Sequence, residues 1–429
     1  MQFDYLETSG ITDQEIEKEG QRLVSYVDRL KSIILQGGYD EPEASINLPA
    51  DKTLVTASQT LARQMHTPHL TVIFVIGIGG SNLGTKAIYD ALIGHFSAIE
   101  TANFPRMIFL DTINPSYISQ LKAYVTKQAL EPEQYVINVI TKSGSTTETV
   151  INLELLLTML PEGISRLVVT TDESSPLDQI SQSKQLPTLH VPRQVGGRFS
   201  IFSPVGLFPL SLAGIHTKTL VEGAFEAREK SVSEEILRNP AAISAIILYL
   251  QAQKGHVVND NFFFNAELES FGKWYRQLMG ESIGKNGTGI LPTVSIGSTD
   301  LHSMVQLYLG GPRNIYTTFY WTARNTYRTE PEPVVPDSPV FTGLVSDIQQ
   351  KNASTVLSII LQGTQRAYRK NNLPFTDLYL DDISEFSLGK LMQFKMIEMM
   401  YLGQLWGINT FNQANVEDYK DETRRILSS

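Results

Sequence analysis

The chain of 429 residues contains no cysteine, which excludes disulfides, thiolate nucleophiles and cysteine-ligated metal sites. It also lacks an apolar run of the roughly 18 residues that a membrane-spanning helix needs, since candidates such as Ala242–Leu250 are too short. Basic residues are in deficit, with 35 Lys and Arg against 45 Asp and Glu, so the formal net charge is −10. Such a charge repels nucleic acid and anionic membranes at long range, and we expect no partner of either kind.

The composition is that of a folded globular protein, with 42% hydrophobic and 19% charged residues. The length favours two domains over one core. The first residues, MQFDYLETSG, have neither the basic start nor the apolar stretch of a signal peptide, so we expect a cytoplasmic protein. An acidic protein can still bind a phosphate, but backbone N–H groups at helix N-termini and a few basic side chains must supply the positive potential locally.

The first half of the chain alternates between expected strands and helices. Thr12 and Glu15 have capping-box spacing at the start of an amphipathic helix. Strands are expected at 71–76, 107–110, 135–140 and 166–170, and helices at 13–35, 84–93 and 147–160. Strands alternating with helices predict a parallel, doubly wound α/β sheet.

The pattern begins again near residue 200, where Ser203 and Pro204 form a good N-cap and first position of a helix. Strands are expected at 256–258, 262–264, 293–296 and 314–320, a surface loop at 329–339, and a Met-rich helix at 388–405. The Met and aromatic stripe of that helix is more typical of a core or a subunit interface than of a cofactor site. These observations place a boundary between two α/β domains near residue 200.

Two turns rich in Gly, Ser and Thr stand directly between a strand and a helix, where free N–H groups can face an anion. The first is Gly77–Ser81, but a dinucleotide fingerprint would require glycine where Asn82 stands. The second contains Lys142-Ser143, but a P-loop would require glycine in place of Val136 and Thr141. A dinucleotide site is therefore weakly indicated, and a nucleoside triphosphate site is disfavoured.

The second turn carries a dense set of hydroxyls, and two interpretations of it stay open. Its hydroxyl-bearing residues are Thr141, Ser143, Ser145, Thr146 and Thr147. An ordinary helix cap uses a single hydroxyl. A monophosphate site at the carboxyl end of a strand would use several of them, and open α/β sheets bind ligands at that edge.

Several residues that suit acid–base chemistry follow in the second half. Glu281 lies between glycines, which predicts a turn that can approach a ligand closely, and His302 follows an expected strand. Gln413 and Lys420 are seven residues apart, which would be two turns of a helix. Each of these alone is more often a solvated surface residue. His66 and His69 enclose Pro68 and have no third ligand nearby, so we expect a loop there and no metal site.

Taken together, these segments resemble the glucose-6-phosphate isomerase family over nearly the whole chain. The carrying segments, in family order, are Gly77-Ile78-Gly79-Gly80-Ser81, Lys142-Ser143-Gly144-Ser145-Thr146, Gly196-Gly197-Arg198-Phe199-Ser200, Gly280-Glu281-Ser282 through Lys285, Thr299-Asp300-Leu301-His302-Ser303, and Gln413 through Lys420. The form Gly-Glu-Ser-x-Gly-Lys is similar to the shorter bacterial branch. Members interconvert glucose 6-phosphate and fructose 6-phosphate through ring opening and an enediolate, in glycolysis and gluconeogenesis.

The resemblance assigns a role to each matching residue. Glu281 is the base that moves a proton between C1 and C2, Arg198 stabilises the enediolate, and His302 and Lys420 open the sugar ring. The positions for phosphate and sugar binding are Gly80, Ser81, Thr141, Lys142, Ser143, Thr146, Gly197, Gln277 and Gln413. One carboxylate placed over both carbons moves the proton without metal or coenzyme, so no cofactor is expected.

The resemblance also implies an architecture. It predicts two αβα sandwiches of the SIS type with parallel-rich sheets, over residues 1–200 and 201–408, and a helical arm over 409–429. In the family the histidine reaches the site from the partner subunit, which predicts a homodimer that shares His302 across its interface.

Three other functions remain open at this point. The first is a sugar-phosphate isomerase with a different or broader substrate, such as mannose 6-phosphate, because proton transfer at C2 permits slow epimerisation. A sugar-phosphate-sensing binding protein would need the hydroxyl-rich turn but not Glu281, Arg198, His302 and Lys420. An NAD-dependent dehydrogenase is weakened by Asn82.

Overall fold

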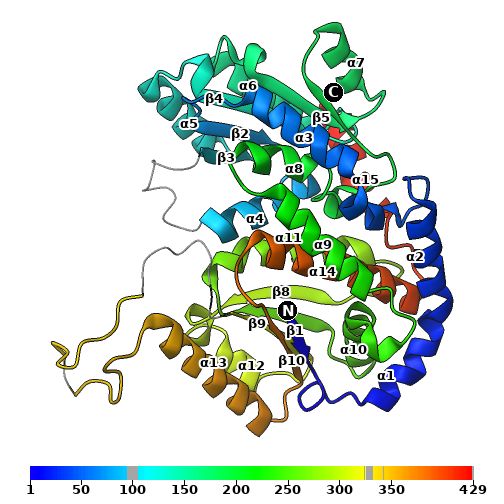
Figure 1. The fold of residues 1–429 in the computed structure, drawn as a ribbon, viewed down its shortest axis with the longest axis vertical. Coiled ribbons are helices and arrows are strands. Elements are labelled where there is room, and N and C mark those ends of the chain that lie inside the picture. The colour runs from blue at the N-terminus through cyan, green and yellow to red at the C-terminus, as the bar shows by residue number, and fades with distance from the viewer. Residues whose placement is uncertain (94–104, 323, 325–331, 342, 428–429) are drawn as a thin grey trace.

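Two five-stranded sheets form the frame of the molecule, with a layer of helices between them (Figure 1). The computed structural model describes residues 1–93, 105–322, 324, 332–341 and 343–427. The expected α/β class, with two parallel-rich αβα units and a helical C-terminal portion, is confirmed. Among the described helices, none combines the length and apolar content that crossing a bilayer requires.

The first sheet has the order β3-β2-β4-β5-β6, and every neighbouring pair is parallel. Its strands are β2 (Val72–Ile76), β3 (Arg106–Leu110), β4 (Tyr135–Ile140), β5 (Leu167–Asp172) and β6 (Thr188–Val191). All residues of β2 and β4 are buried, as parallel strands with both faces covered should be. The associated helices are α3 (Lys52–Met65), α4 (Leu83–Ile93), α5 (Pro115–Gln128), α6 (Thr147–Met159), α7 (Pro176–Ser183) and α8 (Pro204–Leu212).

The second sheet has the order β1-β10-β9-β7-β8 and is parallel except at β1. Its strands are β1 (Gln2–Asp4), β7 (Val258–Phe263), β8 (Leu291–Ile296), β9 (Ile315–Trp321) and β10 (Phe375–Tyr379). Its helices are α9 (Thr217–Lys230), α10 (Pro240–Gln253), α11 (Glu269–Ile283), α12 (Val305–Gly310), α13 (Ala353–Lys370) and α14 (Glu385–Trp406).

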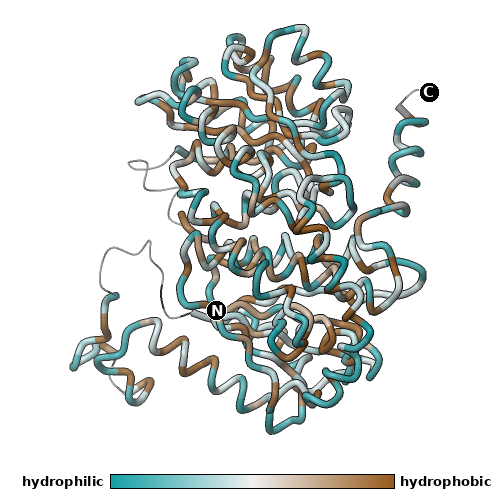
Figure 2. The backbone as a smooth tube through the Cα atoms, turned by 45° about the vertical axis from the view of Figure 1, so that its right-hand side comes forward, coloured by the Kyte–Doolittle hydropathy of each residue, from teal (hydrophilic) through white to brown (hydrophobic). Residues whose placement is uncertain are grey.

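The remaining elements are N- and C-terminal helices and short 3₁₀ turns. The helices are α1 (Asp13–Gly20), α2 (Val24–Gln36) and α15 (Glu417–Leu427). The turns are η1 (Gln21–Leu23), η2 (Ala44–Ala50), η3 (Gly79–Ser81), η5 (Pro132–Gln134), η6 (Gly163–Arg166), η7 (Gly197–Phe199), η8 (Ile236–Arg238), η9 (Ala266–Leu268), η10 (Thr299–Leu301) and η11 (Ala414–Val416). Figure 2 shows α15 standing clear of the body of the molecule at the C-terminus.

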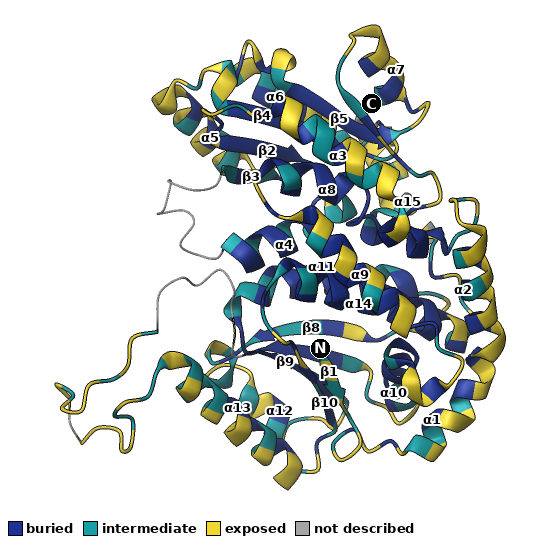
Figure 3. Ribbon diagram, viewed as in Figure 1, coloured by how far each residue is buried: buried dark blue, intermediate teal, exposed yellow. Residues whose placement is uncertain are grey.

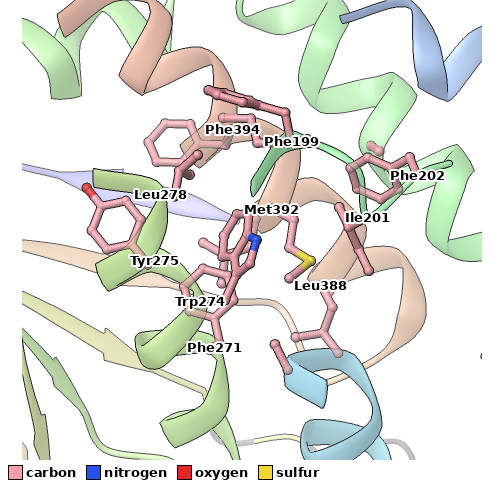
Figure 4. Packing of buried hydrophobic residues seen from close by; sticks show 14 of the residues in the cluster. Phe199, Ile201, Phe202, Phe271, Trp274, Tyr275, Leu278, Leu388, Met392 and Phe394 are labelled. Atoms are coloured by element: carbon pink, nitrogen blue, oxygen red, sulfur yellow. The ribbon is translucent and has the colours of Figure 1, made fainter. Parts of the chain in front are cut away.

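The largest core lies between the two sheets, and α14 runs through it against α9, α10 and α11 (Figure 3). Nearly every residue of α14 is buried, so its Met-rich stripe is confirmed as core. Phe199, the last residue of η7, and Phe202, which follows it, lie in the same cluster as Trp274 and Leu278 of α11 (Figure 4). This packing fixes the segment around residue 198 relative to α11.

Several elements differ from the sequence-based expectations. The strands expected at 256–258 and 262–264 are one strand, β7, whose middle residues Asn259, Asp260 and Asn261 are polar yet buried. Their side chains form hydrogen bonds to neighbouring strands, for example Asn259 to Thr318, which periodicity cannot reveal, and one atom, Asp260 Oδ2, is left without a partner. The helix expected at 13–35 is interrupted by η1, although the Thr12 capping box is confirmed. Of the expected loop, residues 329–331 lie outside the described part.

The N-terminal strand was not expected. β1 pairs with β10, with Phe3 opposite Leu378, so the first residues of the chain belong to the second sheet. The division of the chain at residues 200 and 408 stays a prediction, and β1 crosses the first of these boundaries.

Candidate active site

Two glycine- and hydroxyl-rich turns meet at the carboxyl edge of the first sheet. Gly77 follows β2, and Thr141 follows the neighbouring strand β4. A Cβ on Gly77 would lie 2.8 Å from Ser81 Cβ and 2.9 Å from the Ile140 carbonyl oxygen. The absence of a side chain at Gly77 therefore brings the Ser81 turn against the Thr141 turn, as the adjacent parallel strands predict.

The hydroxyls of the second turn bond to one another. Thr141 Oγ1 and Thr146 Oγ1 are 2.9 Å apart, and Ser143 Oγ lies 3.5 Å from Thr146 Oγ1. Thr146 occupies the N-cap position of α6, yet its side chain makes no capping hydrogen bond. The helix N-terminus thus keeps its N–H groups, while three hydroxyls converge beside it. This arrangement favours an anion site over the ordinary helix cap.

Lys142 lies at the rim of this turn with a mixed set of neighbours. Its ammonium Nζ donates to the Arg193 carbonyl oxygen at 2.5 Å and lies 4.0 Å from Asp172 Oδ2. Burial lowers the pKa of Lys142 below its usual value. Burial also raises the pKa of Asp172 to about 6, and its Oδ1 has no partner. Asp172 and Arg193 belong to no motif, so the sequence alone does not indicate them.

Close backbone contact joins the first turn to η7. A Cβ on Gly80 would clash with the Gly197 carbonyl carbon and the Arg198 amide nitrogen. Only glycine at position 80 lets these two backbones touch. The contact places Arg198 directly beside the two turns.

Arg198 is the best-connected side chain of the site and is 2% exposed. Its Nε donates to Ser282 Oγ at 2.9 Å, and its Nη1 donates to Glu281 Oε2 at 3.1 Å. Burial lowers the pKa of Arg198, and the attraction of Glu281 opposes that shift. A guanidinium remains protonated in proteins, so the site holds a fixed positive charge.

Glu281 is held at both carboxylate oxygens. Oε1 accepts from Gln277 Nε2 at 3.0 Å, and Oε2 accepts from Arg198. The expectation of a turn between glycines is wrong, because Glu281 lies in the last turn of α11, one turn after Gln277 on the same face. Gln277 Oε1 is buried without a partner, and a Cβ on Gly79 would lie 2.8 Å from Gln277 Nε2. The Gln277–Glu281 pair therefore lies against the first turn, Gly77–Ser81.

Arg198 also holds the segment before α15. Its Nη2 donates to the carbonyl oxygens of Thr410 at 2.5 Å and Asn412 at 3.2 Å, and its Nη1 donates to Gln413 Oε1 at 3.2 Å. Lys285 Nζ donates to the Asn409 carbonyl oxygen of the same segment. Backbone carbonyls leave no trace in a sequence, so this set of contacts was missed. Ser282 and Lys285 belong to the Gly-Glu-Ser-x-Gly-Lys motif, but the motif by itself indicates no role for either.

His302 lies elsewhere in the subunit. It is exposed at the end of η10, beyond the carboxyl end of β8. The carboxyl end of β7 lies at the same edge of the sheet, because β7 and β8 are parallel. From there the chain continues into α11, which begins at Glu269 and connects β7 to β8. Glu281 is twelve residues further along α11, which corresponds to about 18 Å of helix. Within one subunit, His302 and Glu281 therefore lie near opposite ends of α11.

Lys420 lies in α15, a helix with mostly exposed side chains, and is itself half-buried. The stretch from Gln413 to Lys420 comprises η11 and the first turn of α15, which differs from the continuous helix considered above. His66 follows the last residue of α3 as its C-cap, and His69 lies in the loop beyond it, as expected. In the described part of the chain, no cluster of three or more His, Asp or Glu side chains forms a metal-binding arrangement.

The chain is similar to known proteins over most of its length. Residues 62–300 match the model of the phosphoglucose isomerase family. A protein of Rubrobacter xylanophilus named glucose-6-phosphate isomerase is 32% identical over 97% of this chain and 95% of its own length. A probable glucose-6-phosphate isomerase of Methanococcus maripaludis is 33% identical over 83% of this chain and 78% of its own length.

Solved structures show the same fold. A hypothetical protein of Thermus thermophilus superposes with a TM-score of 0.85 at 26% identity, covering 100% of both chains. A glucose-6-phosphate isomerase of Chlamydia trachomatis superposes with a TM-score of 0.78 at 20% identity, over 97% of this chain and 86% of its own.

Proposed function

The chain belongs to the phosphoglucose isomerase family and interconverts glucose 6-phosphate and fructose 6-phosphate in glycolysis; we propose that Glu281 is the base that moves the proton. The observation that carries the assignment is the position of the Glu281 carboxylate between Gln277 and Arg198, beside the hydroxyl-rich turns. A carboxylate that alternates between C1 and C2 moves the proton from carbon to carbon without a second base, and the interconversion is complete when the hydroxyl proton of the enediol also passes between O1 and O2.

The Arg198–Glu281 pair explains how charge is handled during the reaction. Before proton abstraction, the guanidinium faces the ionised Glu281 through Nη1. After abstraction Glu281 is neutral, and the negative charge resides on the enediolate oxygen. Nη1 can then turn to that oxygen, so the buried cation always has one anion beside it. A preorganised donor of this kind stabilises charge that develops in the transition state.

The hydroxyl-rich turns supply the phosphate site of this proposal. Ser81, Thr141, Ser143 and Thr146, with the Lys142 amide, bind the phosphate, and the uncapped N-terminus of α6 adds its N–H groups. Gly80 and Gly197 keep this site in contact with Arg198. The phosphate contributes binding energy away from the reacting carbons and holds C1 and C2 under Glu281.

The ring-opening pair completes the proposal, with His302 and Lys420 as proton donor and acceptor and Gln413 as a sugar contact. Because His302 lies near the opposite end of α11 from Glu281, it serves the site of a second copy of the chain. This arrangement requires a homodimer. Imidazole suits the step because it can exchange a proton near neutral pH.

An exposed segment before α13 supports the homodimer. Figure 1 shows residues 332–341 and 343–351 projecting from the lower part of the body. On it, Val340, Phe341, Leu344 and Val345 are 92%, 75%, 78% and 59% exposed. A cluster of exposed apolar side chains marks an interaction surface.

We place the enzyme in the cytoplasm, because the reaction belongs to glycolysis.

The test is proton exchange observed by NMR. Fructose 6-phosphate is incubated with the wild-type protein in D₂O without added metal, and in parallel with the Glu281→Gln variant. We expect glucose 6-phosphate deuterated at C2 from the wild type only, while calorimetry shows that the variant still binds fructose 6-phosphate. Activity of the variant above a few per cent would refute Glu281 as the base. Binding without exchange by the wild type would instead indicate a sugar-phosphate sensor.

A further inference from the structure

We propose that Lys285 is a positioning residue for this reaction, which acts by holding the segment 409–413 so that Gln413 stays beside Arg198 and Glu281. The inference rests on the proposed roles of Glu281 and Arg198 and adds a residue to them.

The contacts converge on one short segment. Lys285 Nζ donates to the Asn409 carbonyl oxygen, and Arg198 Nη2 donates to those of Thr410 and Asn412. Two cations therefore hold three carbonyl groups within four residues. The stretch 407–413 contains no ionisable side chain, so its attraction to the two cations comes entirely from backbone and amide oxygens.

The backbone of Lys285 is fixed close to the catalytic carboxylate. α11 ends at Ile283, and Lys285 lies four residues after Glu281. Its amide donates to the Thr288 carbonyl oxygen at 3.2 Å, and the Thr288 amide donates back at 2.8 Å. Asn286 and Gly287 between them have φ values of 53° and 73°, as a tight two-residue hairpin turn requires. The lysine side chain thus projects from a rigid point.

The segment that Lys285 holds is anchored in the middle and exposed at its end. Thr410 is 3% exposed, and the Phe411 ring packs on Phe199 with centroids 5.5 Å apart. Asn412 and Gln413 are exposed. Lys285 fixes the segment on the N-terminal side of this anchor, at Asn409. Without that contact the segment can pivot about Thr410, and such a rotation moves Gln413 relative to Arg198.

The charges around Lys285 make its contribution dependent on pH. Arg198 of η7 and Glu281 of α11 are the charged groups that face it. Burial lowers the pKa of Lys285 to about 8, repulsion by Arg198 adds to this, and attraction by Glu281 opposes it. Above that pH the amine becomes neutral and holds the Asn409 carbonyl oxygen less strongly, because a charge-assisted hydrogen bond is about twice as strong as a neutral one. The arrangement should therefore loosen above about pH 8.

The experiment compares Lys285→Met, Lys285→Arg and the matched control Lys218→Met, whose lysine is 79% exposed on α9. Steady-state kinetics from pH 6 to 10 are combined with hydrogen–deuterium exchange of peptides covering 405–413. We expect Lys285→Met to lower kcat about tenfold with little change in KM, because the phosphate site that dominates ground-state binding does not involve this segment. Exchange in 405–413 should rise, and the control should match the wild type.

Lys285→Arg provides a readout that a merely structural role would not give. Arginine keeps its proton from pH 6 to 10, so Lys285→Arg should restore kcat, and its activity should begin to fall at a higher pH than that of the wild type. Unchanged kcat for Lys285→Met in an active enzyme overturns the inference, and so does unchanged exchange in 405–413. If the wild-type protein itself fails to isomerise, the proposed function fails, whereas the exchange measurement still decides whether Lys285 holds the segment.

Discussion

Replacing Arg198 by lysine tests whether the planar guanidinium, rather than its charge alone, organises the site. Five acceptor atoms surround Arg198: Ser282 Oγ, Glu281 Oε2, Gln413 Oε1, and the carbonyl oxygens of Thr410 and Asn412. A lysine ammonium has three donors on one nitrogen. At least two of the five acceptors must therefore lose their partner in Arg198→Lys.

The magnitude follows from these contacts. A hydrogen bond to a charged group contributes about 1.5–3 kcal/mol, so two lost contacts amount to about 3–6 kcal/mol. Water can replace the donor at Asn412 and Gln413, which are exposed, but not at Thr410, which is 3% exposed. We therefore expect the free energy of unfolding to fall by about 3 kcal/mol. Loss of a positioned donor at the enediolate should lower kcat by about 10²–10³.

The assay pairs urea denaturation with steady-state kinetics on fructose 6-phosphate. Ser282→Ala serves as the control, since it removes one neutral partner of Arg198 and keeps the guanidinium. A kcat for Arg198→Lys within about threefold of the wild type, well short of the expected 10²–10³, would show that charge suffices and that the fork geometry has no role.

Two further predictions follow from the structure. If His302 serves the partner's site, mixing inactive Glu281→Gln and His302→Ala subunits after reversible dissociation should restore about a quarter of wild-type activity. The reason is that half of a random mixture is heterodimer, and each heterodimer has one intact site of two. No recovery from heterodimers demonstrated by native mass spectrometry would contradict a shared site. Separately, burial raises the pKa of Asp260 from 3.8 to about 6. Its negative charge therefore destabilises the folded state by about 3 kcal/mol at neutral pH, and this destabilisation disappears as the pH falls from 6 to 4 and the carboxylate becomes protonated. The urea concentration at the midpoint of unfolding should then be higher for Asp260→Asn than for the wild type at pH 8, but not at pH 4. Equal midpoints for the two proteins at pH 8 would contradict the raised pKa.

The sequence by itself determined the fold class and much of the chemistry. Buried, mostly apolar runs such as Val72–Ile76 and Tyr135–Ile140 are local signals, because parallel strands covered on both faces are rich in apolar residues. Capping at Thr12 and Ser203 is equally local and is confirmed. Periodicity failed in β7, where Asn259, Asp260 and Asn261 are buried through hydrogen bonds to other strands.

For the site, the sequence supplied the residue types, and the tertiary structure decided which of them meet. Glu281 was identified by its motif, but its placement in a turn was wrong, because the glycines around it say nothing of the core contacts that continue α11 to Ile283. The contact of Gly80 with Gly197 joins residues more than a hundred positions apart and depends on how the turn after β2 packs against η7. The carbonyl groups of Asn409, Thr410 and Asn412 are common to all residue types, so only the folded chain could reveal that Arg198 and Lys285 hold them.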